Sequence, residues 1–109
     1  MVSIGISGGM QEQTREDSEA ISTSSVILAP ARLTFPVRKV IVIRNVSPNA
    51  IDTISISFGD TKKAIVNKGI VLKQNESFVD ASSEGYQAFQ GQIQGICATI
   101  NGVVAIFER

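Results

Sequence analysis

Hydrophobic and polar residues alternate along most of this chain with the two-residue period of β-strands. The clearest case is residues 54–58, Ile-Ser-Ile-Ser-Phe followed by Gly59, a pattern typical of a strand with one buried face. Short apolar runs on either side are separated by turn residues such as Ser47-Pro48-Asn49. About eight strands are expected in this way, and no segment has the period of an ordinary helix. The pattern predicts an all-β fold, either a small antiparallel β-sandwich or a jelly-roll-like barrel.

The segment from Ile96 to Arg109 carries the strongest turn signal. Asn101-Gly102 lies between two β-prone runs, and both residue types tolerate the positive φ angles of a two-residue type I′ hairpin turn. Such a hairpin would be apolar on both faces, whereas a half-exposed hairpin normally has one polar face. Either a second sheet covers one face and a neighbouring chain the other, or the hairpin lies centrally in a barrel. In the first case we expect one face to fill the core, and it comprises Ile96, Ala98, Ile100, Val103, Ala105 and Phe107. We expect the other face to be an oligomer interface, and it comprises Cys97, Thr99, Val104 and Ile106.

The polarity and charge of the chain change near residue 24. Residues 1–24 are polar and hold four acids and one base, whereas residues 25–109 hold six acids and nine bases. We therefore expect an extended polar N-terminal arm over residues 1–24 and a β-sandwich domain over residues 25–109. The arm is either a disordered terminus or a strand that adds to a neighbouring subunit. Within the domain, the alternation slips by one residue at Gly95, which predicts a β-bulge there.

Composition narrows the chemistry that the chain can perform. The 109 residues are 43% hydrophobic and 18% charged with a formal net charge of zero, which suits one compact domain and lacks the basic density of a nucleic-acid binder. Histidine is absent, which excludes Ser-His-Asp and Cys-His arrangements and imidazole metal ligands. Cys97 is interpreted as a small buried hydrophobe, and Asp80 and Glu84 as solvated loop acids. We expect a protein that is not an enzyme and that needs no cofactor or metal.

The sequence shows neither a transmembrane segment nor a signal peptide. No apolar run is long enough for a transmembrane helix, and the N-terminus lacks the basic-then-apolar layout of a signal peptide. We therefore expect synthesis in the cytoplasm, with use there or assembly into something larger, and no membrane partner.

Aromatic and amide side chains are mixed in one segment that precedes the last strands. Tyr86, Gln87, Phe89 and Gln90 have the side-chain types that carbohydrate-binding surfaces use, because rings stack on sugar faces and amides bond hydroxyls. The alternative is that Tyr86 and Phe89 pack at the end of a sheet while the glutamines face water. Both interpretations stay open at this point.

Residues 69–109 resemble the C-terminal part of small structural proteins of tailed bacteriophages. The similar segments are Gly69–Lys73, Glu76–Phe78, Glu84–Tyr86, Gln90-Gly91, Ile93–Ala98 and Ile106–Arg109, with a looser match at Val42–Val46 and Ile56–Gly59. In that group, short β-sandwich domains decorate a capsid, cement its lattice or form part of a fibre. The resemblance therefore implies a β-sandwich with a structural role in a virion.

Together these features predict a viral structural protein that binds the major capsid protein and stabilises the shell as a decoration or cement protein. We expect a homotrimer in the virion, assembled in the host cytoplasm, because closed symmetric oligomers suit a sheet that is apolar on both faces. The alternatives are a receptor- or carbohydrate-binding tip that uses the segment around Tyr86, and a tail or baseplate subunit. Four bases are either contacts for an acidic shell surface or solvated strand ends: Arg38, Lys39, Lys62 and Lys63.

Overall fold

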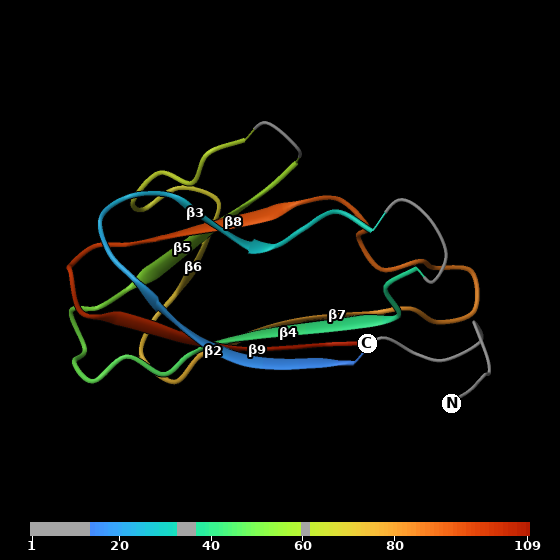
Figure 1. Ribbon diagram of the computed structural model, residues 1–109, viewed down its shortest axis with the longest axis horizontal. Coiled ribbons are helices and arrows are strands. Elements are labelled where there is room, and N and C mark those ends of the chain that lie inside the picture. The colour runs from blue at the N-terminus through green and yellow to red at the C-terminus, as the bar shows by residue number, and fades with distance from the viewer. Residues whose placement is uncertain (1–13, 33–36, 60–61) are drawn as a thin grey trace, which may run out of the picture.

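A computed structural model describes residues 14–32, 37–59 and 62–109. The described residues contain eight strands and no helix, as Figure 1 shows. The strands are β2 (Arg15–Ile21), β3 (Val26–Ala29), β4 (Val40–Asn45), β5 (Ile54–Phe58), β6 (Ile70–Leu72), β7 (Ser77–Ala81), β8 (Ile93–Cys97) and β9 (Gly102–Glu108). The all-β class expected from the alternation is therefore confirmed.

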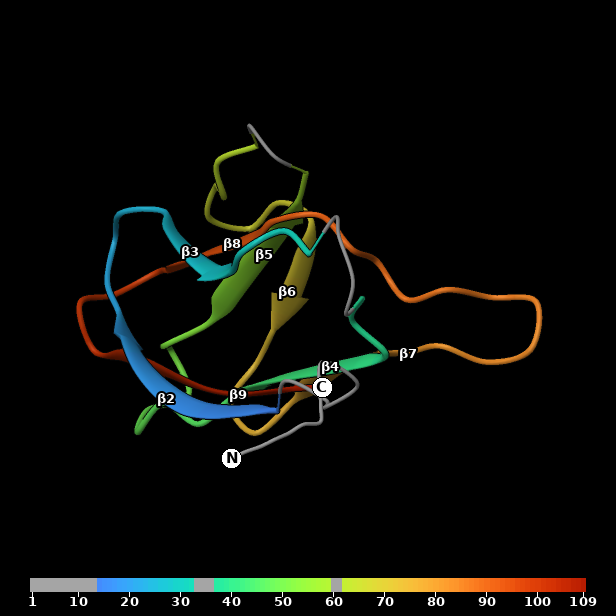
Figure 2. The same ribbon diagram turned by 45° about the vertical axis from the view of Figure 1, so that its right-hand side comes forward.

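The eight strands form two four-stranded antiparallel sheets that pack face to face (Figures 1 and 2). One sheet has the order β2-β9-β4-β7 and the other has the order β3-β8-β5-β6. The first four strands pair with the last four in reverse order, as β2 with β9, β3 with β8, β4 with β7 and β5 with β6. This long ribbon wraps so that β9 also pairs with β4, and β8 with β5. Such connectivity is that of a jelly roll.

The core lies between the two sheets and is almost entirely aliphatic. Its buried members are Ile21, Leu28, Ala29, Ile41, Ile43, Ile54, Ile56, Leu72, Ile93, Cys97, Val104 and Ile106. Three aromatic rings close one end of this core, with the ring centroid of Phe58 lying 5.2 Å from that of Phe78 and 5.4 Å from that of Phe89. Both spacings fall in the range in which aromatic pairs attract one another.

The hairpin expected at Asn101-Gly102 is wrong. β8 and β9 do not pair with each other but lie in different sheets, and residues 98–101 cross from one sheet to the other. Neither Asn101 nor Gly102 has a positive φ angle, so Gly102 is not needed for the conformation of a type I′ turn. A Cβ atom on Gly102 would lie 2.7 Å from the Cβ and Sγ atoms of Cys97 and 2.7 Å from the carbonyl oxygen of Ile21. Close packing across the sandwich therefore requires this glycine.

The boundary expected at residue 24 is also wrong. Residues 15–21 form β2, an edge strand that pairs with β9 of the same chain from Arg15 opposite Glu108 to Ile21 opposite Gly102. Its polar composition suits an edge strand, since charged side chains discourage pairing with other chains. The proposed strand exchange with a neighbour is thus replaced, for these residues, by pairing within the chain. The rest of the expected arm, residues 1–13, lies outside the described residues.

The register shift lies in β3 and not at Gly95. The β5–β8 ladder runs without interruption through Gly95, whereas β3 shifts between Ile27 and Ala29 where it pairs with β8. A Cβ atom on Gly95 would come within 2.5 Å of the Cδ1 atom of Leu28. The glycine therefore makes room for the side chain that the irregular strand directs into the core.

Candidate interaction surfaces

The residues expected to form an oligomer interface lie inside the domain. Cys97, Val104 and Ile106 are buried in the core between the sheets, and Thr99 is half-buried. Because β9 joins the opposite sheet from β8, its even-numbered residues face inward and its odd-numbered residues face outward. The interface prediction is therefore wrong. The side of β9 that was expected to form the interface lies in the core, and the side that was expected in the core faces outward. The interpretation of Cys97 as a buried hydrophobe is confirmed.

The outer face of the β2-β9-β4-β7 sheet is largely apolar and uncovered by other described residues. We call this surface the docking face. It comprises Ala20, Val40, Val42, Val79, Ala81, Val103, Ala105 and Phe107, with Glu16, Ser18, Arg44 and Ser77 among them. Val79 is 59% exposed, and the three β9 residues are half-buried. A contiguous apolar patch on the surface of a small domain is typical of an interaction site.

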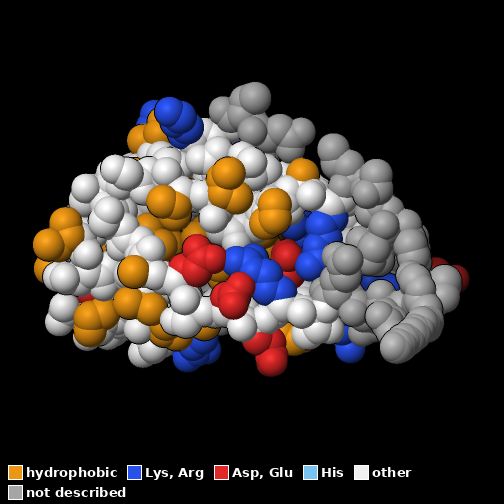
Figure 3. All heavy atoms as spheres, in the orientation of Figure 1, with side chains coloured by type: hydrophobic (Ala, Val, Ile, Leu, Met, Phe, Trp, Pro, Cys, Tyr) orange, Lys and Arg blue, Asp and Glu red, His pale blue; other side chains and the backbone are white. Residues whose placement is uncertain are grey.

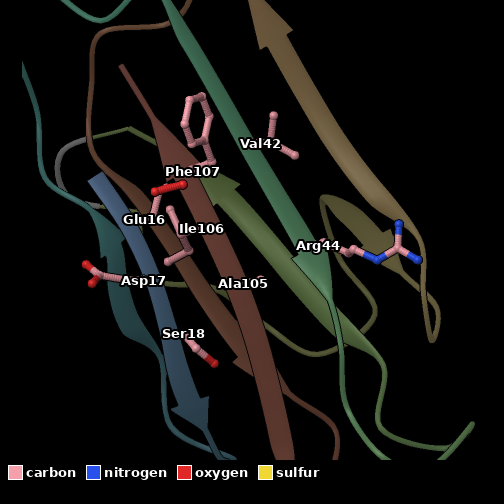
Figure 4. A pocket seen from close by; sticks show the side chains of 8 residues that line it. All are labelled: Glu16, Asp17, Ser18, Val42, Arg44, Ala105, Ile106 and Phe107. Atoms are coloured by element: carbon pink, nitrogen blue, oxygen red, sulfur yellow. The ribbon is translucent and has the colours of Figure 1, made fainter. Parts of the chain in front are cut away.

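A groove of about 470 Å³ lies across the docking face and is lined by residues of β2, β9 and β4 (Figure 4). Ala105 and Phe107 of β9 lie in its centre, while Glu16 of β2 and Arg44 of β4 lie on opposite sides. Within the described part of the chain, neither Glu16 nor Arg44 has an ion-pair partner; Arg44 makes one long contact, 3.5 Å to the hydroxyl of Ser77. The groove therefore has an apolar centre and two opposite, unpaired charges.

A second apolar surface lies at one end of the sandwich, where the chain crosses between strands. We call it the loop end, and it comprises the β4–β5 connection, residues 46–53, and the β8–β9 connection, residues 98–101. Ile51 is 72% exposed and Ile100 is 77% exposed. Figure 3 shows hydrophobic side chains gathered at the end where Figure 1 places these two connections. Turns normally contain small or polar residues, so two isoleucines in turns are unusual. This departure is the one feature of the sequence from which the loop end could have been predicted.

Hydrogen bonds hold the two connections of the loop end together. The hydroxyl of Thr99 donates to the carboxylate of buried Asp52 over 2.5 Å, and the other oxygen of Asp52 accepts from the amide of Asn49 over 3.1 Å. The side chain of Asn45 donates to the carbonyl oxygens of Asp52 and Leu72, at 2.8 and 2.9 Å. The Thr99–Asp52 bond joins the two connections, and the other three bonds brace the β4–β5 connection and its neighbouring strands. The two isoleucines are therefore presented on a rigid support.

A buried ion pair lies at the other end of β9. Arg38 is fully buried and its Nε atom donates to the carboxylate of Glu108 over 3.1 Å, while Arg32 donates to the other carboxylate oxygen over 2.8 Å. The guanidinium of Arg38 also donates to the carbonyl oxygens of Pro30, Phe89 and Gly91, at 2.7, 2.7 and 3.2 Å. Burial lowers the pKa of Arg38, and the charge of Glu108 opposes this shift. Each of the three guanidinium nitrogens therefore has at least one acceptor inside the domain.

The four bases that were candidates for contact with an acidic surface differ in their exposure. Arg38 is excluded, because its side chain is buried and bonded on every side. Lys39, Lys62 and Lys63 are exposed, and the last two line a shallow pocket of about 260 Å³ together with Lys68. Both interpretations, contact with an acidic surface and solvation, stay open for the three exposed lysines, whereas neither fits the buried Arg38.

The four residues of the candidate carbohydrate surface do not act together. The ring of Phe89 packs edge-on against Phe58, and the side chain of Gln90 bonds both the amide and the carbonyl group of Arg38 at 2.6 Å. Tyr86 and Gln87 are exposed on the β7–β8 connection. The sheet-end interpretation therefore fits Phe89 and Gln87, but it is wrong for Tyr86, which is exposed, and for Gln90, which is bonded within the domain.

Tyr86 should titrate above the usual tyrosine pKa. Its hydroxyl donates to the carboxylate of Asp80 over 2.6 Å, and this bond, together with partial desolvation and the charge of Asp80, raises the pKa of Tyr86. The bond exists only in the protonated phenol, so its contribution is present below the unfolded pKa and is lost as the pH rises through the folded one. Because Tyr86 is the one tyrosine, the ultraviolet absorbance of phenolate reports it alone.

The matched measurement uses the Asp80→Ala variant, whose titration midpoint should return to about 10. A wild-type midpoint equal to that of the variant would contradict the bond.

No family model and no curated protein matches this chain. Among the described residues, no three potential metal ligands gather in one place. The described residues also form no helix that is long and apolar enough to cross a membrane. The chemistry of the surfaces themselves therefore carries the functional argument.

Proposed function

We propose that this chain is a virion structural protein that decorates the shell formed by a major capsid protein and stabilises it. The observation that carries the proposal is the loop end, where Ile51 and Ile100 project from two connections that a buried hydrogen-bond network joins. A rigid apolar tip loses little conformational entropy when it binds, which favours insertion into a preformed depression on another protein. Single exposed aliphatic side chains are common, but two large ones on adjoining connections form the kind of grouped apolar surface that marks an interaction site.

Two further features support this role. The jelly roll is a fold that recurs in viral capsid proteins, although the same fold also serves other functions. The segment from Gly69 to Arg109, which resembles phage structural proteins, contains β6 to β9 and therefore half of the loop end. No comparable observation favours the carbohydrate-binding alternative, because Phe89 and Gln90 are committed to the domain interior.

Binding to capsids tests the proposal directly. The purified protein should co-sediment with shells assembled from the major capsid protein encoded in the same genome, at a fixed number of copies per shell. Ile51→Asp and Ile100→Asp should each weaken binding at least about tenfold, because each variant removes one buried aliphatic side chain from the contact.

Ile65→Asp provides the matched control, since Ile65 is 56% exposed but lies in the β5–β6 connection. This variant should bind capsids as the wild type does. A wild-type protein that stays in the supernatant, or that binds isolated tails and not capsids, would contradict the decoration role.

A further inference from the structure

We propose that the docking face binds a second copy of this chain in a two-fold symmetric dimer. The centre of the contact would be Ala105 and Phe107 of β9, and two ion pairs between Glu16 of one copy and Arg44 of the other would flank it. The inference does not depend on the proposed virion role, because the loop end lies at the end of the sandwich and stays open in such a dimer. Its basis is the charge pattern of the groove.

The strand register fixes where the two charges lie. Glu16 on β2 pairs with Phe107 on β9, and Arg44 on β4 pairs with Ala105 on β9. Because β2 and β4 flank β9 at about 4.8 Å on either side, the midpoint between the two charged residues falls on β9, between Ala105 and Phe107. The apolar side chains of Ala105 and Phe107 thus lie at the centre of the charge pattern of the groove (Figure 4).

This arrangement is complementary to itself. Consider a two-fold axis that passes through the midpoint, in the plane of the contact and at right angles to the line from Glu16 to Arg44. Rotation about this axis places Arg44 of the second copy opposite Glu16 of the first, and the reverse pair forms by symmetry. The strands of the two copies then cross at about 70°, which is close to the orthogonal packing of two sheets.

The size of the face sets the expected strength. Four strands at about 4.8 Å and about six residues at 3.3 Å give a face of roughly 400 Å² in projection, which is small for a specific interface. A dimer of micromolar affinity is therefore expected, with ion pairs that set its orientation more than its strength. Sedimentation equilibrium over about 10 to 500 µM protein covers this range of affinity.

Charge reversal tests the pairing between copies. Glu16→Arg places two Arg–Arg contacts in the dimer, Arg44→Glu places two Glu–Glu contacts, and each should weaken dimerisation at least about tenfold. An equimolar mixture of the two variants should recover dimers of near wild-type affinity, because each mixed dimer has two contacts of opposite charge. The double variant Glu16→Arg/Arg44→Glu should recover the homodimer for the same reason.

Controls and contrary outcomes follow from the same geometry. Glu84→Arg and Lys63→Glu make the same charge changes at exposed positions away from the docking face and should dimerise as the wild type does. A wild type that stays monomeric at about 500 µM, or that forms mainly the trimer expected from the sequence, would overturn the proposal. A mixture of the reversed variants that associates no better than either alone would overturn it as well.

Discussion

Replacing Arg38 with methionine should lower the free energy of unfolding by about 3–5 kcal/mol. The variant leaves the buried carboxylate of Glu108 without its fully buried partner, and it leaves the carbonyl oxygens of Pro30 and Phe89 without a donor. Unpaired buried groups are costly because nothing replaces the water that they lost on folding. Urea-induced unfolding at neutral pH, followed by circular dichroism, measures the difference.

The matched control is Arg44→Met, which makes the same substitution on the exposed side of β4. That variant should change the free energy of unfolding by less than about 0.5 kcal/mol, because Arg44 makes no close contact within the described residues. An Arg38 variant as stable as the Arg44 variant would show that the buried cluster contributes little. A charge-neutral change, Glu108→Gln, should fall between the two because the amide oxygen can still accept from Arg38.

Local alternation was sufficient to predict the class of fold but not which strands pair. The Ile-Ser-Ile-Ser-Phe segment forms β5 with the bounds that its pattern indicates. The jelly-roll pairs join strands far apart in the chain, such as Arg15 of β2 with Glu108 of β9, and no local pattern encodes such a contact. The Asn101-Gly102 signal misled for the same reason, since a short turn can join two strands of different sheets as well as two strands of one hairpin.

The candidate surfaces were partly visible in the sequence. The apolarity of both sides of the last strand predicted an apolar surface outside the core, and the structure has one on the outer side of β9. The pairing of β9 with β2 and β4 decides which residues lie on that side. A fully buried Arg38 could not be anticipated, because its partners Phe89 and Glu108 lie 51 and 70 residues further along the chain. Side-chain burial here depends on tertiary contacts and not on the residue type alone.

The two proposed surfaces would reinforce each other. A dimer formed through the docking face presents two loop ends, each with its own Ile51 and Ile100. Attachment of one loop end to a repeating surface raises the local concentration of the other, so the dimer would bind a shell more tightly than a monomer does. Variants at Glu16 should therefore weaken capsid binding indirectly, without touching the loop end.

Val104→Asp and Ala105→Asp should have opposite outcomes although the two residues are neighbours on β9. Val104 is 0% exposed between the sheets, and a carboxylate there has no partner within the described residues to compensate for its burial. We expect a loss of more than about 4 kcal/mol, which is enough to unfold a domain of ordinary stability. Circular dichroism and urea titration should show an unfolded or barely folded chain.

Ala105 lies in the centre of the groove on the outer face, where an aspartate keeps contact with water. Its substitution should cost less than about 1 kcal/mol of folding stability while it abolishes dimerisation, because two like charges would meet at the two-fold axis. If instead Val104→Asp gave a folded monomer and Ala105→Asp unfolded, β9 would be turned the other way. Its even-numbered residues would then be the interface, as the hairpin interpretation of the sequence holds.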